Sequence, residues 1–357
     1  MSRLEERYRL VLRLLPAAYR RQWEEDMVAA FLDSVDTGDP ETTDDLAEFG
    51  RPSLSEVASV LSLAVRLRLG GADAPPRSYA WGQAVRLATL TAMLTQAVTV
   101  TASIAVALWL SGKVDWLPAP AAELALAPPR DAWHTAWNLA GYAWLPAYVA
   151  LVLGHRRVAR AVALLAVVPP AVTTAVEQAA GAAPPTVSPW AMRLVDVVLL
   201  LAMAAFHHDA PPVRPRPWLL ALPIGILLVP VPLFVAQATT PALRLLDWPG
   251  LACAVVTAAM AVHLALRVPV RRSRTLPWSL ALTLLAVATL ALRAVTLPDH
   301  GAQAQGGILT TIAAVQAVAV LAVGAPVAAL AVRALRRLPP VAAAPAPDPG
   351  DPSVGVP

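Results

Sequence analysis

Long apolar stretches recur along most of the chain, separated by short segments that contain charged or polar residues. About 20 apolar helical residues are needed to cross a hydrocarbon core about 30 Å thick. Eight stretches reach that length, so the pattern predicts an all-α fold with a polytopic bundle of eight transmembrane helices. They lie near residues 85 to 110, 132 to 153, 158 to 176, 189 to 206, 217 to 237, 248 to 266, 277 to 297 and 308 to 332.

The basic residues between these stretches predict the orientation, because short loops rich in Arg and Lys stay on the cytoplasmic side. With the N-terminus inside, twelve basic residues fall on the cytoplasmic side and three outside, or five if Arg193 and Arg293 are included. Removing either of the two most interrupted stretches, the third or the fourth, would invert every later loop and spoil this asymmetry. The cytoplasmic set is Arg156, Arg157, Arg160, Arg214, Arg216, Arg267, Arg271, Arg272, Arg274, Arg333, Arg336 and Arg337; the outer set is Lys113, Arg130 and Arg244.

Several prolines fall within the expected spans, where they should kink or interrupt helices. Discontinuous helices often line transporter sites, although membrane helices also tolerate proline without a functional reason. Both interpretations stay open. The prolines are Pro146, Pro169, Pro170, Pro223, Pro230, Pro232 and Pro326.

Residues 1–71 follow a different pattern and predict a small three-helix head. The first two apolar stripes are Leu4, Tyr8, Val11, Leu15 and then Tyr19, Trp23, Met27, Ala30, Phe31, and the polar segment at 37–45 separates them from the third helix. Ser53 and Glu56 offer a capping box for that helix, whose stripe is Leu54, Val57, Leu61 and Ala64. Tyr19, Trp23, Met27 and Phe31 are candidate partner-binding residues, and the alternative is that they form the head's own core.

The remaining chain divides simply. Residues 72–84 form a linker, 85–332 the transmembrane domain, and 338–357 a disordered tail rich in Pro and Ala. No secretory signal is visible in the first residues, so we expect both termini in the cytoplasm and the bundle in the plasma (inner) membrane.

Two segments of the head resemble a known group of proteins: "RYRLVLRLLPAAYRRQWEEDMVAAFLD" at 7–33 and "RPSLSEVASVLSLAVRLRLG" at 51–70. They look like the cytoplasmic N-terminal segment of uncharacterised actinobacterial integral membrane proteins. They are also similar to helical prefix domains of the HAAS and permease-prefix kind, which are often encoded beside PadR-like regulators. The resemblance covers about 70 of the 357 residues. It implies a regulatory or sensing membrane component.

Composition agrees with a membrane protein, since 57% of the residues are hydrophobic, 15% are charged and the mean hydropathy is +0.58. The single cysteine, Cys253, lies in an apolar run and cannot form an internal disulfide.

Ionisable residues inside the spans are the candidate functional site, because charge within the bilayer is costly unless paired or hydrated. Arg193 and Asp196 lie three residues apart on one helix face, toward the outer side, and Glu177 and Arg293 could join them in a polar pocket. The alternative is structural: Arg193 and Asp196 neutralise each other while Arg293 extends outward.

Four further polar residues lie at the cytoplasmic ends of spans four and six: His207, His208, Asp209 and His263. Metal binding or pH sensing is conceivable there. Adjacent histidines on a helix cannot both face one ion, however, so interfacial polar residues are the favoured interpretation.

Motifs for nucleotide-driven or hydrolytic chemistry are absent from the sequence: it has no GxxxxGK[ST], GxSxG or HExxH. We therefore expect no enzyme activity, no cofactor, no metal site and no direct nucleic-acid binding. The expected partners are the lipid bilayer and a cytoplasmic protein bound by residues 1–71. The function predicted is a regulatory, sensing or scaffolding membrane protein; the alternative is a transporter or permease subunit without its own ATPase.

Overall fold

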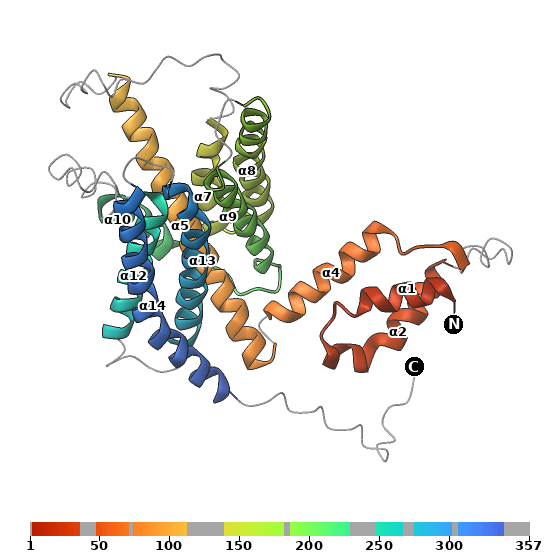
Figure 1. Cartoon of the computed structure of the whole chain (residues 1–357). Helices are drawn as coiled ribbons and strands as arrows, with labels where there is room; N and C mark the ends of the chain where they lie inside the picture. The colour runs from red at the N-terminus through yellow and green to blue at the C-terminus, as the bar shows by residue number, and fades with distance from the viewer. Residues whose placement is uncertain are drawn as a thin grey trace.

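The computed structural model describes residues 2–35, 48–70, 74–112, 139–181, 186–228, 247–266, 275–301 and 306–338, and every regular element in these ranges is a helix. The fold is all-α, as the apolar pattern predicts (Figure 1). The α-helices are α1 (Arg3–Leu12), α2 (Ala17–Val35), α4 (Leu54–Leu69), α5 (Pro76–Leu110), α7 (Trp144–Val152), α8 (Arg156–Ala179), α9 (Ser188–Ala202), α10 (Pro215–Leu228), α12 (Trp248–Ala265), α13 (Thr275–Gly301) and α14 (Gly306–Arg336). Two 3₁₀ turns, η2 (Gly141–Ala143) and η3 (Met203–Ala205), precede α7 and extend α9.

Six helices in the described ranges are long and apolar enough to cross a membrane: α5, α8, α9 with η3, α12, α13 and α14. Two shorter apolar helices, Gly141–Val152 and Pro215–Leu228, fall within the expected second and fifth spans. Residues 132–138 and 229–237 of those two spans lie outside the described ranges, so the count of eight stays a prediction. The arginine-rich segment at 267–274, the polar segment at 37–45, the tail from 339 on, and Lys113, Arg130 and Arg244 also lie outside them.

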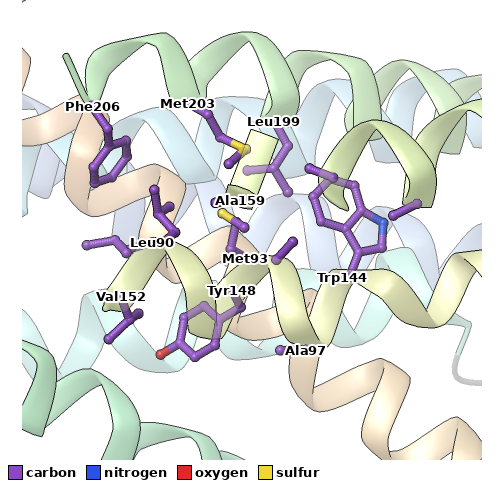
Figure 2. Close-up of a cluster of buried hydrophobic side chains, with 14 of the residues drawn as sticks. Leu90, Met93, Ala97, Trp144, Tyr148, Val152, Ala159, Leu199, Met203 and Phe206 are labelled. Carbon is purple, nitrogen blue, oxygen red and sulfur yellow. The ribbon is translucent and has the colours of Figure 1, made fainter. Parts of the chain in front are cut away.

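Helices α5 and α13 pack against each other and join two groups of helices (Figure 1). α7, α9 and α10 contact α5, while α12 and α14 contact α13. The largest buried cluster lies in the first group, where Met93 of α5 meets Tyr148 of α7, Ala159 of α8 and Met203 of η3 (Figure 2). A second cluster, around Met260 and Val320, joins α12 to α13 and α14.

Large apolar side chains also cover the outside of the bundle. On α8 the exposed set is Val158, Leu164, Leu165, Val168, Val172 and Val176, and on α9 it is Leu194, Val197, Val198 and Leu201. A soluble protein rarely exposes apolar patches of this extent. Helices with this length and surface are those of a multi-pass membrane protein whose bundle faces lipid.

Most prolines in the described part of the expected spans lie inside continuous helices. α8 continues through Pro169 and Pro170, α10 through Pro223 and α14 through Pro326, while Pro146 lies in the first turn of α7. The expected interruption is therefore not found at the four prolines of α8, α10 and α14. Pro146 follows the 3₁₀ turn η2, which does interrupt the α-helical pattern of the second span, and Pro230 and Pro232 lie outside the described residues. Neighbouring hydroxyl groups bond within the helix, as when Thr173 and Thr174 donate to the carbonyls of Pro169 and Pro170 at 3.0 and 2.9 Å.

Helices α1, α2 and α4 share one buried apolar cluster, in which Tyr8 stacks on Phe31 with ring centroids 4.0 Å apart. The expected capping box of α4 is confirmed: the Ser53 hydroxyl accepts from Glu56 N at 3.2 Å, and Glu56 accepts from Ser53 N at 2.8 Å. The expected stripes are partly wrong. α4 buries Val60 and Ala64 while Leu54 and Leu61 are exposed, and α2 buries Val28 where Ala30 was expected.

Helix α4 ends directly against α5, where two glycines permit a close approach. Gly70 ends α4 with a φ of +57°, and a Cβ added there would lie 2.8 Å from the backbone of Ser78. A Cβ added at Gly82 would lie 1.5 Å from the carbonyl oxygen of Leu69. Because α5 begins at Pro76, residues 76–84 of the expected linker form its first turns, and α4 is joined closely to the bundle.

Candidate functional site

Asp196 forms the centre of a polar cluster inside the bundle. Its side chain is buried, and both carboxylate oxygens accept hydrogen bonds: Oδ1 from Gln96 Nε2 and Oδ2 from Arg193 Nη1, each at 3.0 Å. Arg193 is on the same helix, α9, whereas Gln96 belongs to α5. The cluster therefore ties two helices together as well as pairing two opposite charges.

The cluster lies deep along its helix. Asp196 is the ninth residue of the 18-residue candidate span Ser188–Ala205, so it is about 12 Å from either end at 1.5 Å per residue. The helix bounds put it near the middle of this candidate span, and the side of the membrane toward which it lies stays a prediction. A carboxylate at that depth is stabilised only by partners such as the two it has here.

Gln96 is the residue that the sequence analysis missed. It is a single amide side chain within the apolar stretch of the first span, and it has no charge to mark it as a candidate. A polar side chain that can hydrogen-bond across helices is itself a signal within a span.

Arg293 belongs to a different pair. It is buried on α13, where its Nη1 donates to the carboxylate of Asp247. Asp247 also caps the N-terminus of α12, accepting from Gly250 N at 3.0 Å. No hydrogen bond or ion pair joins Arg293 to Arg193 or Asp196 in the described ranges, and a pocket shared by these residues stays a prediction.

Glu177 lies near the end of α8, half-buried, and within the described ranges it makes no ion pair with the other three candidates. Its neighbour Gln178 instead accepts from Trp190 Nε1 of α9. At this same end of the bundle Asp299 of α13 accepts from Val187 N, Ser188 N and the Ser188 hydroxyl. A carboxylate at a helix N-terminus complements its dipole, so these contacts fix where α9 begins.

The four candidate partner-binding residues separate into two kinds. Phe31 is buried in the cluster shared by α1, α2 and α4, and Tyr19 and Met27 pack against its edge. Trp23 is 43% exposed and is the member of the set whose ring remains available at the surface. Three of the four therefore have a structural role in the head.

The polar residues after α9 are placed at the opposite end of the bundle from Asp299, next to α4. His207 is buried, His208 lies 2.8 Å from Asp209, and Asp209 approaches Arg66 of α4 at 3.9 Å. His263 of α12 shares a hydrogen bond of 2.9 Å with Ser279 of α13. In the described residues no three His, Cys, Asp or Glu side chains come together as metal ligands would.

Comparison with known proteins gives no match to a family model, to a curated protein or to a solved structure. Inside the bundle, the described residues give one cluster of charged and amide side chains, formed by Gln96, Arg193 and Asp196.

Proposed function

We propose that this protein is a regulatory, sensing or scaffolding component of the plasma membrane, which crosses it eight times with both termini in the cytoplasm. Its head, residues 1–71, binds a soluble protein partner. The resemblance of 7–33 and 51–70 to prefix-type segments supports this role. The predominance of arginine in the expected cytoplasmic loops supports the eight-span topology.

The observation that carries the proposal is the close joint between α4 and α5. The carbonyl of Leu69 rests on Gly82, and Arg86 Nη1 lies 3.5 Å from the carbonyl oxygen of Gly70. α4 also shares the buried cluster of α1 and α2. A change in the packing of α5 would therefore move α4, and through the shared cluster it would also move α1 and α2.

Exposed apolar side chains on the head supply the surface for a partner. Trp23, Phe49, Leu54 and Leu61 are 43%, 68%, 89% and 51% exposed. Aromatic residues of this kind are enriched where proteins dock. Leu54 and Leu61 lie seven residues apart on α4, hence on one helix face.

Partner capture from native membranes tests this role. Trp23→Ala and Leu54→Ala should each reduce the amount of co-purifying partner several-fold, while Leu10→Ala, which also removes an exposed apolar side chain of the head, should leave it unchanged. Removal of residues 1–70 should abolish capture without preventing membrane insertion. Equal capture by the shortened chain would contradict the proposal.

A transporter or permease subunit remains the second candidate, favoured by the cluster of Gln96, Arg193 and Asp196. Such a site would bind a polar or charged substrate near mid-membrane while another protein supplies energy. Asp196→Asn should then abolish substrate movement in vesicles while the chain still inserts and folds. Unchanged movement in a folded Asp196→Asn variant would exclude this site as the substrate path.

A further inference from the structure

Four arginines from three helices surround the end of α9 that faces α4. Arg66 belongs to α4, Arg86 to α5, and Arg156 and Arg160 to α8. Three of them donate to carbonyl groups of η3 and of the two residues that follow it. Arg86 Nη1 reaches Ala205 O at 3.3 Å, Arg160 Nη2 reaches Met203 O at 3.1 Å and Phe206 O at 3.2 Å, and Arg156 donates to His207 O.

These bonds account for only part of the donor capacity. Carbonyl groups at a helix C-terminus attract cations, so one or two arginines would suffice to cap them. Each guanidinium has five N–H donors. Arg86 is 3% exposed, yet its Nε and Nη2 have no hydrogen-bond partner among the described residues, and the same holds for Arg66 Nε.

The positive charge also exceeds the negative charge around it. Within the described ranges Asp209 is the carboxylate that approaches the four arginines, at 3.9 Å from Arg66, and half of its side chain is exposed. Arg86, Arg156 and Arg160 have no carboxylate partner in the same ranges. Among the described residues, several buried or half-buried cations therefore lie near one carboxylate that is itself half-exposed.

The pKa of His207 reflects these charges. It follows the candidate span that ends at Ala205, and neither of its ring nitrogens has a hydrogen bond in the described part of the chain. Burial lowers the pKa of His207, and the nearby Arg86, Arg66 and His208 lower it further, against the opposing effect of Asp209. The imidazole therefore lies near three basic side chains and one carboxylate among the described residues.

We propose that this basic cluster binds a phosphate-bearing anion, held by Arg66, Arg86, Arg156 and Arg160. Guanidinium forks match phosphate oxygens in geometry, and such charge-assisted bonds are the strong ones. Arg66, Arg156 and Arg160 are half-buried, and Arg86 is buried with two donor atoms that have no partner among the described residues.

The position of the arginine cluster relative to the expected spans indicates where such an anion would come from. Arg86 lies where the first span expected from the sequence begins, ten residues into the apolar helix Pro76–Trp109, and Arg156 and His207 flank two other span ends. In the expected topology the cluster is therefore near the membrane interface. Phosphate groups of anionic lipids reach that depth, and basic regions between membrane helices bind such headgroups. Free phosphate from solution has the same chemistry.

A bound phosphate would link α4 to α5 and α8, and thereby hold the head against the bundle. This inference goes beyond the proposed regulatory role and does not depend on it, because it concerns a ligand of the junction and not the partner of the head.

Thermal unfolding of the purified full chain in a neutral detergent tests the site. Phosphatidylglycerol should raise the Tm in a saturable manner, and phosphatidylcholine should not. Inorganic phosphate added alone separates the sources: a comparable rise indicates that the free anion suffices, and no rise together with a phosphatidylglycerol effect assigns the site to a lipid headgroup. No rise with either phosphate source would overturn the proposal.

Charge-matched variants locate the effect. Arg66→Gln leaves the carbonyl contacts of the other three arginines intact and should weaken the apparent phosphatidylglycerol affinity about 10-fold. Arg157→Gln removes the same charge from an exposed position beside Arg156 and should change it less than about twofold. Arg86→Lys keeps the charge but loses the fork, and should weaken binding while the chain stays folded. If all three variants bind phosphatidylglycerol as tightly as the unmodified protein, the lipid binds elsewhere and the assignment is overturned.

Discussion

Gln96 on α5 donates a hydrogen bond of 3.0 Å to Asp196 on α9, 100 residues away in the sequence. With the ion pair to Arg193, this bond satisfies both oxygens of a buried carboxylate near the middle of a candidate span. A carboxylate within an apolar span is costly to bury, and in this protein Asp196 instead joins α5 to α9.

Removal of Asp196 should be costly because it leaves Arg193 without its counter-ion and Gln96 without its acceptor. We expect Asp196→Ala to destabilise the bundle by about 3 kcal/mol, and Gln96→Ala by about 1 kcal/mol. Unfolding in mixed detergent micelles measures both. Leu194→Ala, on the lipid-facing side of the same helix, is the control and should change stability far less. A bundle that tolerates Asp196→Ala as well as Leu194→Ala would contradict the structural role.

Gly82 should be essential for the joint between the head and the bundle. A Cβ at this position would overlap the carbonyl group of Leu69, which is backbone and cannot rotate away. Gly82→Ala should therefore separate α4 from α5, increasing hydrogen exchange in α4 by at least about 10-fold. Gly141→Ala, where an added Cβ meets nothing within 4 Å, is the matched control. Unchanged protection of α4 in Gly82→Ala would show that the joint is looser than described.

The pair formed by Asp247 and Arg293 should respond asymmetrically to substitution. The Arg293 side chain is 4% exposed and the Asp247 side chain is 31% exposed. Asp247→Ala therefore removes the counter-ion of a buried cation. Arg293→Met leaves a carboxylate that water can reach and that still caps α12. We expect a loss of about 3 kcal/mol for Asp247→Ala and a clearly smaller one for Arg293→Met. Thermal unfolding of the two variants in one detergent compares them; a larger loss for Arg293→Met would refute this order.

The stability of the head should fall at acidic pH in part through Glu25. Arg9 donates to both carboxylate oxygens of Glu25 at 2.8 Å, and these bonds lower the pKa of Glu25 below its ordinary value. A carboxyl group with a lowered folded-state pKa contributes stability above its unfolded pKa, and that contribution is lost as the pH falls through about 4 and below.

Hydrogen exchange of α1 and α2, corrected for the intrinsic rate at each pH, measures this loss between about pH 6 and pH 3. Glu25→Gln should flatten the profile. Glu6→Gln, which removes an exposed carboxylate of α1, should leave it unchanged. If the pH profile of hydrogen exchange is the same in the wild-type protein and in Glu25→Gln, the Arg9–Glu25 pair does not contribute to the acid sensitivity of the head.

Much of the fold could be predicted from the sequence because lipid imposes a simple rule on length and polarity. Where the structure describes them, the hydropathy pattern predicted most bundle helices within a few residues, whereas α5 begins at Pro76, nine residues before the expected start. Ser53 with Glu56 predicted the start of α4. The stripes of the head were less accurate. α4 carries apolar residues on two faces, and periodicity alone does not tell which face meets α1 and α2.

The polar contacts were harder to predict, since pairing depends on which helices are neighbours. Arg193 and Asp196 were foreseeable as an i, i+3 pair, whereas Gln96 and Asp247 required knowledge of how α5 meets α9 and how α12 meets α13. Asp247 did carry a local signal, because an Asp directly before a Trp-Pro pair is typical of a helix N-cap.

The predicted topology is tested most directly by measuring on which side of the membrane two positions lie, one in the head and one in the turn after α8. In a Cys253→Ser background, Ser55→Cys places a thiol on α4 and Ala180→Cys places one at the opposite end of the bundle, both at exposed positions. An impermeant maleimide should label Ala180→Cys in intact cells, and Ser55→Cys only after the membrane is permeabilised. Labelling of Ser55→Cys from outside intact cells would contradict the cytoplasmic head and the function proposed for it.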